Sequence, residues 1–309
     1  MRVITLPEFG SALELSEIDT PQPAAGEVRV RVHAASVNGF DVAVANGYLQ
    51  GAMEHRFPVV LGKDFAGVID AVGDDVTGFA IGDRVFGVVT KDFLGDGSFG
   101  EYVTVPAAVG VAQLPAAVSF TDAAPLGLAG AAAIDAIAAA NIHAGSVVLV
   151  AGATGGVGLQ AVQLAVHAGA TVLATASTDE SRALLTELGA STVDHTGDLL
   201  AQVHAAHPDG VDVALHFAGD ATTLVDAVKP GGRLVSTLIM TPEQLATESV
   251  TVVPVYANPS TSTLQALATN QVENRTAVTV QRVYGLDETP AALADFAGGK
   301  LGKLVIGIR

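Results

Sequence analysis

A glycine-rich turn within residues 147–177 has the residue types and spacing to bind a phosphate-bearing cofactor. It fits the pattern G-x-G-x-x-G with alanine in the first glycine position, and its residues are Ala153, Thr154, Gly155, Gly156, Val157 and Gly158. Gly155 would let the backbone approach a pyrophosphate, and Gly158 would let a helix pack close to the preceding strand. A helix that begins here would direct its N-terminal N–H groups at the phosphates. We therefore predict that the turn binds a dinucleotide.

The pattern carries weight only where a strand precedes the turn and a helix follows it. Val147–Val150 is a β-branched run typical of a buried parallel strand, Leu159–Ala168 is a predicted helix, and Thr171–Ala176 is the next strand. These elements stand in the order that a dinucleotide site requires. The alternative is a tight turn between strand and helix that binds nothing.

The end of the strand 171–176 bears on which dinucleotide is bound. An Asp or Glu there would accept hydrogen bonds from two ribose hydroxyls, but the sequence has Ala176 followed by Ser177. The missing carboxylate removes a repulsion against a 2′-phosphate, and Arg182 offers a guanidinium fork suited to phosphate. We therefore expect NADPH, not NADH. Asp179 and Glu180 temper this expectation, and the alternative for Arg182 is a solvated helix residue.

The composition excludes several kinds of site and partner. The chain has 309 residues and no cysteine, which rules out disulfides, thiolate zinc sites and a cysteine nucleophile. Its net charge of −17 argues against nucleic acid and anionic membranes as partners. Residues 147–177 are apolar, but their glycine turn indicates a buried unit and not a membrane span. The N-terminus lacks the pattern of a signal peptide, so we expect a cytoplasmic protein.

The sequence pattern changes along the chain, and this change predicts two domains. Residues 1–112 contain short strand candidates and many glycines, with a helical turn near Asn38–Gly47, and predict a strand-rich, barrel-like domain. From Thr121 the chain turns alanine-rich, which predicts a helix broken near Pro125. Strands are then predicted at 147–150, 171–176, 191–194, 211–217, 233–238 and 250–256, and helices at 159–168, 179–188, 198–207 and 221–228, the last stopped by Lys229–Gly232. This alternation predicts an α/β fold with a doubly wound parallel sheet, the Rossmann arrangement.

The C-terminal residues are expected to return to the first domain. A helix at 262–271 is followed by the tail segment 277–284, a helix at 287–297 and a final strand at 304–308. The predicted domains are therefore 1–112, 113–274 and 275–309. The β-branched run Val250–Val255 would lie at the edge of the sheet, where an uncovered strand invites pairing with a second copy. We expect a homodimer through this edge.

Several stretches together resemble the medium-chain dehydrogenase/reductase superfamily, in its zinc-free quinone oxidoreductase branch. They are VHAASVN at 32–38, LGKDFAGV at 61–68, GDRVF at 82–86, GSFGEY at 97–102, the turn at 153–158 and Gly302-Lys303. The resemblance covers nearly the whole chain. It implies a GroES-like catalytic domain and a Rossmann domain, with the active site in the cleft between them.

The resemblance also bears on metal. Zinc-dependent members carry Cys and then Gly-His-Glu as ligands, whereas this sequence has Gly62-Lys63-Asp64 and no cysteine. Lys63 cannot ligate zinc while it is protonated. Without a Lewis acid to hold an alkoxide, the implied reaction is hydride transfer to a substrate that is already polarised, namely a quinone or an α,β-unsaturated carbonyl.

The resemblance places five residues near the cleft. Tyr48 is the first choice for a phenol that donates to the substrate oxygen, with a substrate-lining aromatic as its alternative. Asn38 would orient substrate or nicotinamide through its amide. Asp41 and Asp64 are expected to fix loops through backbone N–H groups. Lys63 would supply positive charge or be solvated.

On the cofactor side the resemblance implies contacts beyond the glycine turn. They come from Leu126 and Gly127 near the cleft, Ser177, Arg182, His195 against the adenine, Phe217, Ala218 and Ser236. The sequence departs from the family at His216, where Asp is usual at the strand end. We expect His216 to be a hydrogen-bonded neighbour, and its alternative role is a proton donor.

Three functional hypotheses follow. The first is an NADPH-dependent reductase of quinones or α,β-unsaturated carbonyls. The second is an enoyl or ketone reductase that serves one tailored substrate of a biosynthetic pathway. The third is a protein that binds NADPH without turnover, as a sensor or structural protein.

Overall fold

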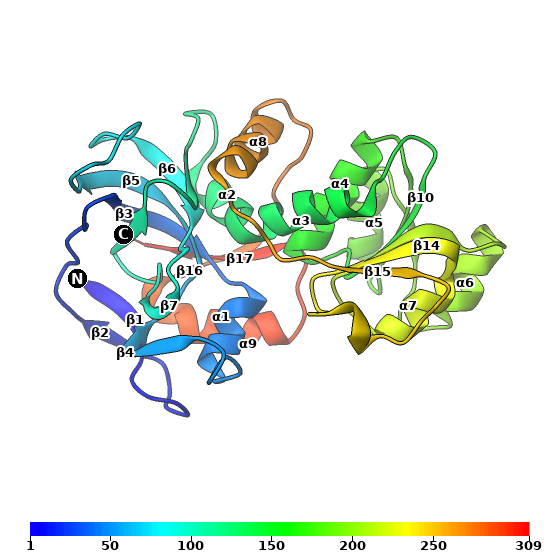
Figure 1. Ribbon diagram of the computed structural model, residues 1–309, viewed down its shortest axis with the longest axis horizontal. Coiled ribbons are helices and arrows are strands. Elements are labelled where there is room, and N and C mark those ends of the chain that lie inside the picture. The colour runs from blue at the N-terminus through cyan, green and yellow to red at the C-terminus, as the bar shows by residue number, and fades with distance from the viewer. Residues whose placement is uncertain (309) are drawn as a thin grey trace. The chain divides into compact units, whose positions relative to one another are not determined.

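A six-stranded parallel sheet is the centre of one of the two units that make up the structure. The computed structural model describes residues 1–308, and the parallel-sheet unit comprises Ala132–Asn258 and Asn274–Ala277. Its strands lie in the order β12-β11-β10-β13-β14-β15, and each pairs in parallel with its neighbours (Figure 1). Their bounds are β10 Val147–Ala151, β11 Thr171–Thr175, β12 Ser191–Val193, β13 Val211–His216, β14 Val228–Ser236 and β15 Thr251–Pro254. The two halves meet at β10 and β13, which confirms the predicted doubly wound sheet.

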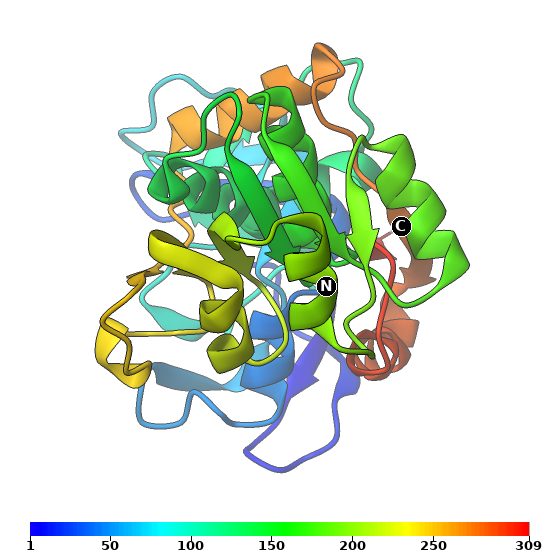
Figure 2. The ribbon, with the colours of Figure 1, turned by 90° about the vertical axis from the view of Figure 1, so that its right-hand side faces the viewer.

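Helices cover both faces of this sheet (Figure 2). They are α3 Gly127–Ala140, α4 Gly156–His167, α5 Asp179–Glu187, α6 Leu199–Ala206, α7 Ala221–Ala227 and the short η2 Pro242–Gln244. Successive side chains of β10 point to opposite faces, as strand geometry requires. Val148 and Val150 share a hydrophobic cluster with Val162 of α4, whereas Leu149 shares another with Leu224 of α7. The sheet is therefore buried on both sides, which accounts for the β-branched runs in its strands.

Helix α4 and strand β14 begin earlier than predicted. Helix α4 begins at Gly156, three residues earlier than expected, because Gly155 serves as its N-cap. Residues 229–232 do not form a loop after α7, because β14 already begins at Val228 and runs to Ser236. Val228 pairs with Val211, and an irregularity follows before regular pairing resumes. The predicted strand 233–238 is thus wrong at both ends, since a proline and two glycines are tolerated where the pairing is irregular.

The strand-rich unit comprises Met1–Ala131, Pro259–Glu273 and the chain from Val278 onward. One sheet has the order β16-β17-β3-β5-β6-β9, with β8 also paired to β3, and the other has the order β2-β1-β4-β7. The strands are β1 Arg2–Leu6, β2 Glu14–Glu17, β3 Glu27–Ser36, β4 Glu54–Val60, β5 Asp64–Val72, β6 Arg84–Val88, β7 Phe93–Asp96, β8 Tyr102–Pro106, β9 Val111–Gln113, β16 Val280–Gly285 and β17 Lys303–Gly307. The helices are α1 Gly39–Ala45, α2 Phe120–Ala123, η1 Ala124–Leu126, α8 Thr261–Val272, η3 Leu286–Glu288 and α9 Thr289–Ala297. Since β17 pairs with β3, the C-terminal segment returns to the N-terminal sheet as predicted.

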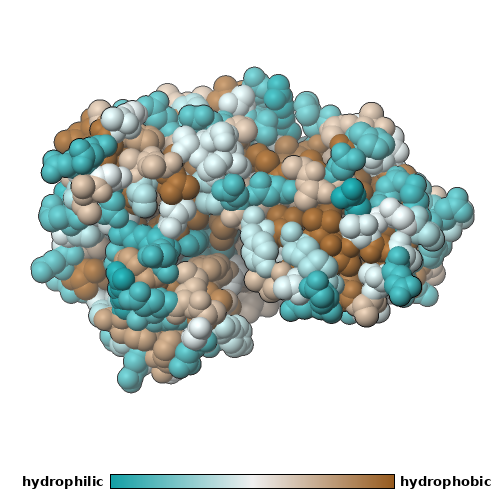
Figure 3. All heavy atoms as spheres, viewed as in Figure 1, coloured by the Kyte–Doolittle hydropathy of each residue, from teal (hydrophilic) through white to brown (hydrophobic). Residues whose placement is uncertain are grey.

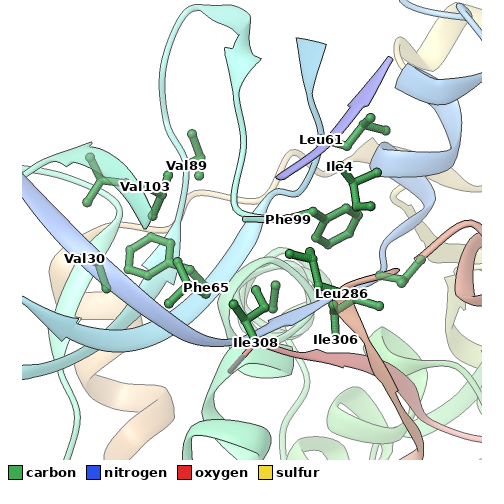
Figure 4. Packing of buried hydrophobic residues seen from close by; sticks show 14 of the residues in the cluster. Ile4, Val30, Leu61, Phe65, Val89, Phe99, Val103, Leu286, Ile306 and Ile308 are labelled. Carbon is green, nitrogen blue, oxygen red and sulfur yellow. The ribbon is translucent and has the colours of Figure 1, made fainter. Parts of the chain in front are cut away.

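The core of the strand-rich unit joins side chains from distant parts of the chain (Figure 4). Phe65 of β5 and Phe99 are fully buried, and they share a cluster with Ile4 of β1 and Ile306 of β17. Burying one such side chain contributes about 1.5–3 kcal/mol. This packing holds two charged residues in place, Asp64 at the start of β5 and Lys303 at the start of β17.

The two units divide the chain differently from the predicted domains. Residues 113–131 and helix α8 belong to the strand-rich unit and not to the parallel-sheet unit. A Cβ added to Gly130 would lie 2.8 Å from the side chain of Leu267 in α8, and Pro259 accepts the N–H of Gly110 at 3.1 Å. The sequence pattern predicts the helix but carries no information about which sheet it packs against.

The helical run Phe120–Ala140 is long and apolar enough to cross a membrane by length and composition alone. However, 67% of its apolar window is buried inside the protein, as in a core helix. The run is broken as predicted, because η1 with Pro125 separates α2 from α3.

Candidate functional site

The glycine turn of the parallel-sheet unit has the geometry of a phosphate-binding loop. β10 ends at Ala151, and α4 starts at Gly156 directly after the turn. A Cβ on Gly158 would lie 2.2 Å from the carbonyl oxygen of Gly152, whereas a Cβ on Gly155 would meet nothing closer than 3.5 Å. Gly158 therefore permits close packing of helix and strand, whereas Gly155, at the N-terminus of a 12-residue helix, has room for a Cβ in ordinary contact. The turn fits a pyrophosphate held by backbone N–H groups.

The loop after β13 packs directly against this turn. A Cβ on Gly152 would lie 2.9 Å from the Cβ of Ala218, and Phe217 donates its N–H to Ala151 at 3.0 Å. Gly152 also donates its N–H to the hydroxyl of Thr175 at the end of β11, at 3.0 Å. The structure thus places Phe217 and Ala218 beside the glycine turn, at the carboxyl edge of the sheet where doubly wound folds bind ligands.

Arg182 lies near Ser177 but its guanidinium is already paired. It donates to the carboxylate of Asp194 at 2.8 Å and more weakly to the carbonyl of Ser177 at 3.4 Å. The pKa of Asp194 is lowered first by two hydrogen bonds from Thr196, one from its hydroxyl and one from its backbone N–H. The charge of Arg182 lowers it further. His195 lies between Asp194 and Thr196 in the chain and is exposed. A 2′-phosphate near Ser177 would therefore compete with Asp194 for Arg182.

His216 and Ser236 end β13 and β14 and are buried, with 3% and 0% of their surface exposed. Nδ1 of His216 lies 2.9 Å from the Ser236 hydroxyl, and Nε2 lies 3.1 Å from the carbonyl of Gly219. Both ring nitrogens are thus engaged inside the protein, as expected for a hydrogen-bonded neighbour. The Ser236 hydroxyl faces the ring, so this side chain lies under the loop surface and not on it.

In the strand-rich unit, Asp64 is the centre of a buried polar network. Its Oδ2 accepts hydrogen bonds from the Ser36 hydroxyl at 2.6 Å and the Asn38 amide at 2.8 Å, and its Oδ1 accepts the N–H of Leu128 at 2.8 Å. Lys303 donates to Oδ1 of Asn38 at 2.6 Å, and its Nζ lies 3.8 Å from Asp64. The carboxylate is entirely buried, so these partners satisfy it.

The hydrogen bonds of this network bear on the expectation that the Asn38 amide orients substrate or nicotinamide. Its amide nitrogen binds Asp64 and its amide oxygen binds Lys303, and the residue is 6% exposed. An amide committed at both ends has no free group with which to orient a substrate. Asn38 instead links a buried carboxylate to a buried ammonium.

Asp41 and Lys63 are adjacent and have shifted pKa values. Asp41 accepts the N–H of Asn38 at 2.8 Å at the start of α1 and is buried. Burial, followed by the charge of Asp64, raises the pKa of Asp41 to about 7. Burial lowers the pKa of Lys63, whose Nζ lies 4.8 Å from the ring centre of Phe40. These residues line a cavity of about 30 Å³, which has room for about one water molecule.

Two further predicted residues differ in exposure. Tyr48 follows α1 with 77% of its surface exposed, and its phenol makes no hydrogen bond within residues 1–308. Leu126 is fully buried in η1, and the next residue, Gly127, lies so close to Asp64 that an added Cβ would be 2.9 Å from its Oδ1. Leu126 therefore contributes side-chain packing beneath the network.

The side chains at residues 62–64 do not provide the ligands of a zinc site. Both oxygens of Asp64 are already occupied, and Lys63 stands where a ligating histidine would be needed. Across residues 1–308, no group of three or more His, Cys, Asp and Glu side chains is placed to hold a metal ion. Structural and catalytic zinc sites need at least three such ligands.

Comparisons with known proteins give matches in both units. Residues 24–116 match the alcohol dehydrogenase GroES-like domain, and residues 156–265 match the family described as zinc-binding dehydrogenase. Human quinone oxidoreductase is 38% identical over 197 residues, which are 62% of this chain and 58% of that protein. The Streptomyces orinoci spectinabilin polyketide synthase system protein NorB is 40% identical over 221 residues, which are 69% of this chain and 9% of that protein.

The same class of fold occurs among solved structures. The quinone oxidoreductase from Coxiella burnetii is similar with a TM-score of 0.90 and 29% identity, over 100% of this chain and 99% of that one. The two matched domains, the doubly wound sheet and the glycine turn lead to one conclusion. The chain belongs to the medium-chain dehydrogenase/reductase superfamily, in its quinone oxidoreductase branch, a superfamily whose members bind a nicotinamide cofactor.

Proposed function

We propose that this chain is an oxidoreductase that transfers hydride from NADPH to a quinone or an α,β-unsaturated carbonyl compound. The observation that carries the proposal is the glycine turn, in which Gly158 has no room for a side chain and Gly155 has room for a Cβ in ordinary contact only. The human and Coxiella burnetii relatives, both named quinone oxidoreductase, support the class of acceptor.

In the proposed reaction, the cofactor supplies the hydride when it is bound. The backbone N–H groups of the turn bind the phosphates, and the loops at the ends of β13 and β14 support the binding surface. Negative charge develops on the acceptor oxygen, and the exposed Tyr48 phenol is our candidate for the proton donor. Positioning can supply about 7–11 kcal/mol, and one hydrogen bond to the developing oxyanion about 2–4 kcal/mol. Tyr48→Phe should therefore slow turnover without abolishing it.

We also propose that this reaction needs no metal. A quinone or enone is electrophilic through conjugation, so no Lewis acid is required to polarise it. The chain lacks cysteine, and Lys63 replaces the histidine of the zinc-dependent pattern. Dialysis against a chelator should leave the rate of NADPH oxidation unchanged, and a loss that added Zn²⁺ restores would contradict this.

The preference for NADPH is proposed from Ala176, Ser177 and Arg182. Arg182→Ala should raise the KM for NADPH by about tenfold or more, the effect of losing one charge-assisted contact, and should change the KM for NADH little. Asp194→Asn should lower the KM for NADPH, because it releases the guanidinium that Asp194 binds at 2.8 Å. Arg56→Ala is the matched control, since Arg56 is paired with Glu54 in the strand-rich unit. Equal effects of Arg182→Ala on both cofactors would contradict the assignment.

A second candidate is an enoyl reductase dedicated to one pathway. The polyketide synthase relative from Streptomyces orinoci favours it. A panel of simple quinones and enones, followed by NADPH absorbance at saturating cofactor, separates the candidates. Turnover of simple quinones supports the main proposal, whereas turnover confined to an enoyl thioester supports the second. Tight NADPH binding with no turnover of any acceptor would leave a cofactor-binding sensor or structural protein.

We also make proposals about the oligomeric state, the location and the partners of the protein. We propose a homodimer through β15, which is the edge strand of its sheet and lies where hydrophobic residues gather on the face shown in Figure 3. Sedimentation at micromolar concentration should give twice the chain's 31.1 kDa, and a monomer would contradict it. We further propose a cytoplasmic location. On the basis of the −17 charge, we also propose that neither nucleic acid nor a membrane is a partner. A DNA gel-shift and a vesicle flotation assay should both be negative.

A further inference from the structure

The strand ends of β13 and β14 carry a buried histidine–serine pair that the proposed reaction does not use directly. His216 and Ser236 are directly opposite each other in the sheet and are almost completely buried. The pair therefore calls for an explanation in terms of its own hydrogen bonds.

Those hydrogen bonds determine which ring nitrogen of His216 carries the proton. The Ser236 oxygen accepts the N–H groups of Leu238 and Ile239, each at 3.0 Å, which uses both of its lone pairs. Its hydrogen must then point to Nδ1 of His216, 2.9 Å away. Nδ1 is therefore an acceptor, and the hydrogen on Nε2 is donated to the carbonyl of Gly219 at 3.1 Å.

This chain of bonds joins two loops that leave the carboxyl edge of the sheet. Leu238 and Ile239 belong to the loop after β14, and Gly219 belongs to the loop after β13. The loop after β13 is the one that packs against Gly152 of the glycine turn. Its other end is anchored by Asp220, whose carboxylate accepts the N–H of Thr223 at 2.8 Å and caps α7.

We propose that neutral His216, protonated on Nε2, is a positioning residue for the dinucleotide, because with Ser236 it ties the loop after β13, which packs against the glycine turn, to the loop after β14. An aspartate could accept the Ser236 hydroxyl, but in its ionised form it has no hydrogen to donate to Gly219. The tie between ring and loop therefore depends on the N–H group of the imidazole. The proposal rests on the binding of NADPH proposed above, and it places the ring behind the binding surface.

The first test is binding of NADPH, followed by its fluorescence, to the full chain. His216→Asn keeps an acceptor near the Nδ1 position but cannot reach Gly219, and Ser236→Ala removes the hydroxyl between the loops. Each should raise the Kd for NADPH by about tenfold, the loss of about one loop-ordering hydrogen bond. His167→Asn, at the exposed end of α4, is the control and should bind as wild type does. Thermal unfolding followed by circular dichroism establishes that each variant is folded at the assay temperature.

The second test is nitrogen-15 NMR of histidine-labelled protein, which does not depend on activity. The resonances that disappear in His216→Asn should show a protonated Nε2 and an unprotonated Nδ1 at neutral pH. A protonated Nδ1 would overturn the hydrogen-bond assignment. Unchanged NADPH affinity in folded His216→Asn and Ser236→Ala would overturn the positioning role alone. If wild type binds neither NADPH nor NADH, the proposed function fails and the positioning role fails with it.

Discussion

At the scale of single residues, the molecule is most sensitive where charge is buried. Asp64 and Lys303 are 0% and 4% exposed, and their charged atoms lie 3.8 Å apart with Asn38 hydrogen-bonded to both. Taking two ions out of water costs several kcal/mol each, and their mutual attraction offsets this only with well-placed hydrogen bonds. Removal of one partner is therefore worse than removal of both.

The first prediction follows from that asymmetry. Asp64→Asn leaves the Lys303 ammonium buried without its nearest counter-charge, and the free energy of unfolding should fall by about 3–5 kcal/mol. The double variant Asp64→Asn with Lys303→Met should be less destabilised than the sum of the single variants. Urea unfolding of the three variants measures this. Strict additivity would mean that the two groups do not interact.

The second prediction concerns pH and Asp41. Its pKa of about 7 in the folded chain lies above its ordinary value of 3.8, so the folded chain holds this proton more tightly than the unfolded chain. The stabilisation is fully present below about pH 4 and is lost as the pH rises toward about 7.

Asp41→Asn should therefore flatten the decrease of stability between pH 5 and pH 8. Each unit of pKa difference corresponds to about 1.4 kcal/mol. Urea unfolding at several pH values measures the slope, and Asp19→Asn, at an exposed position, should keep the wild-type slope. The same slope in both variants would contradict the role of Asp41.

At the scale of elements, the glycine turn separates two requirements that the sequence motif combines. Gly158 is needed for α4 to pack against β10, because an added Cβ would overlap the Gly152 oxygen, whereas a Cβ on Gly155 would make only an ordinary contact at 3.5 Å. Gly158→Ala should therefore lower Tm by several degrees, as for a backbone clash costing about 1–3 kcal/mol. Gly155→Ala should leave Tm nearly unchanged and raise the Kd for NADPH by about tenfold or more. A fall in Tm with unchanged affinity for Gly155→Ala would contradict the predicted approach of the phosphates.

At the scale of the whole molecule, the strand-rich unit depends on the last part of the chain. β17 pairs with both β3 and β16, and it supplies Lys303 to the buried network. Deletion of the chain from Val278 onward exposes β3 and leaves Asp64 without the ammonium, so that unit should not fold. Near-ultraviolet circular dichroism and limited proteolysis measure this. Retention of wild-type protease resistance by residues 1–131 would contradict it.

The sequence alone predicted the elements whose patterns are local. The β-branched runs and the glycine turn identify the parallel sheet because buried strands and a βα turn impose their requirements within a few residues. The same holds for the break near Pro125, where a proline removes a backbone donor. The unusual residue His216 was also evident from the sequence, although its partners were not.

Only the tertiary structure decided what the side chains do. Asn38 carries an amide that a sequence pattern allows to face a substrate, yet Asp64 and Lys303 occupy both of its ends. Arg182 lies where a 2′-phosphate is expected, yet Asp194, twelve positions later, already binds it. Helix α8 was evident as a helix, but its packing with Leu267 beside Gly130 of α3 was not. Local sequence determines backbone conformation, whereas the state of a polar group depends on partners that only folding brings within hydrogen-bond distance.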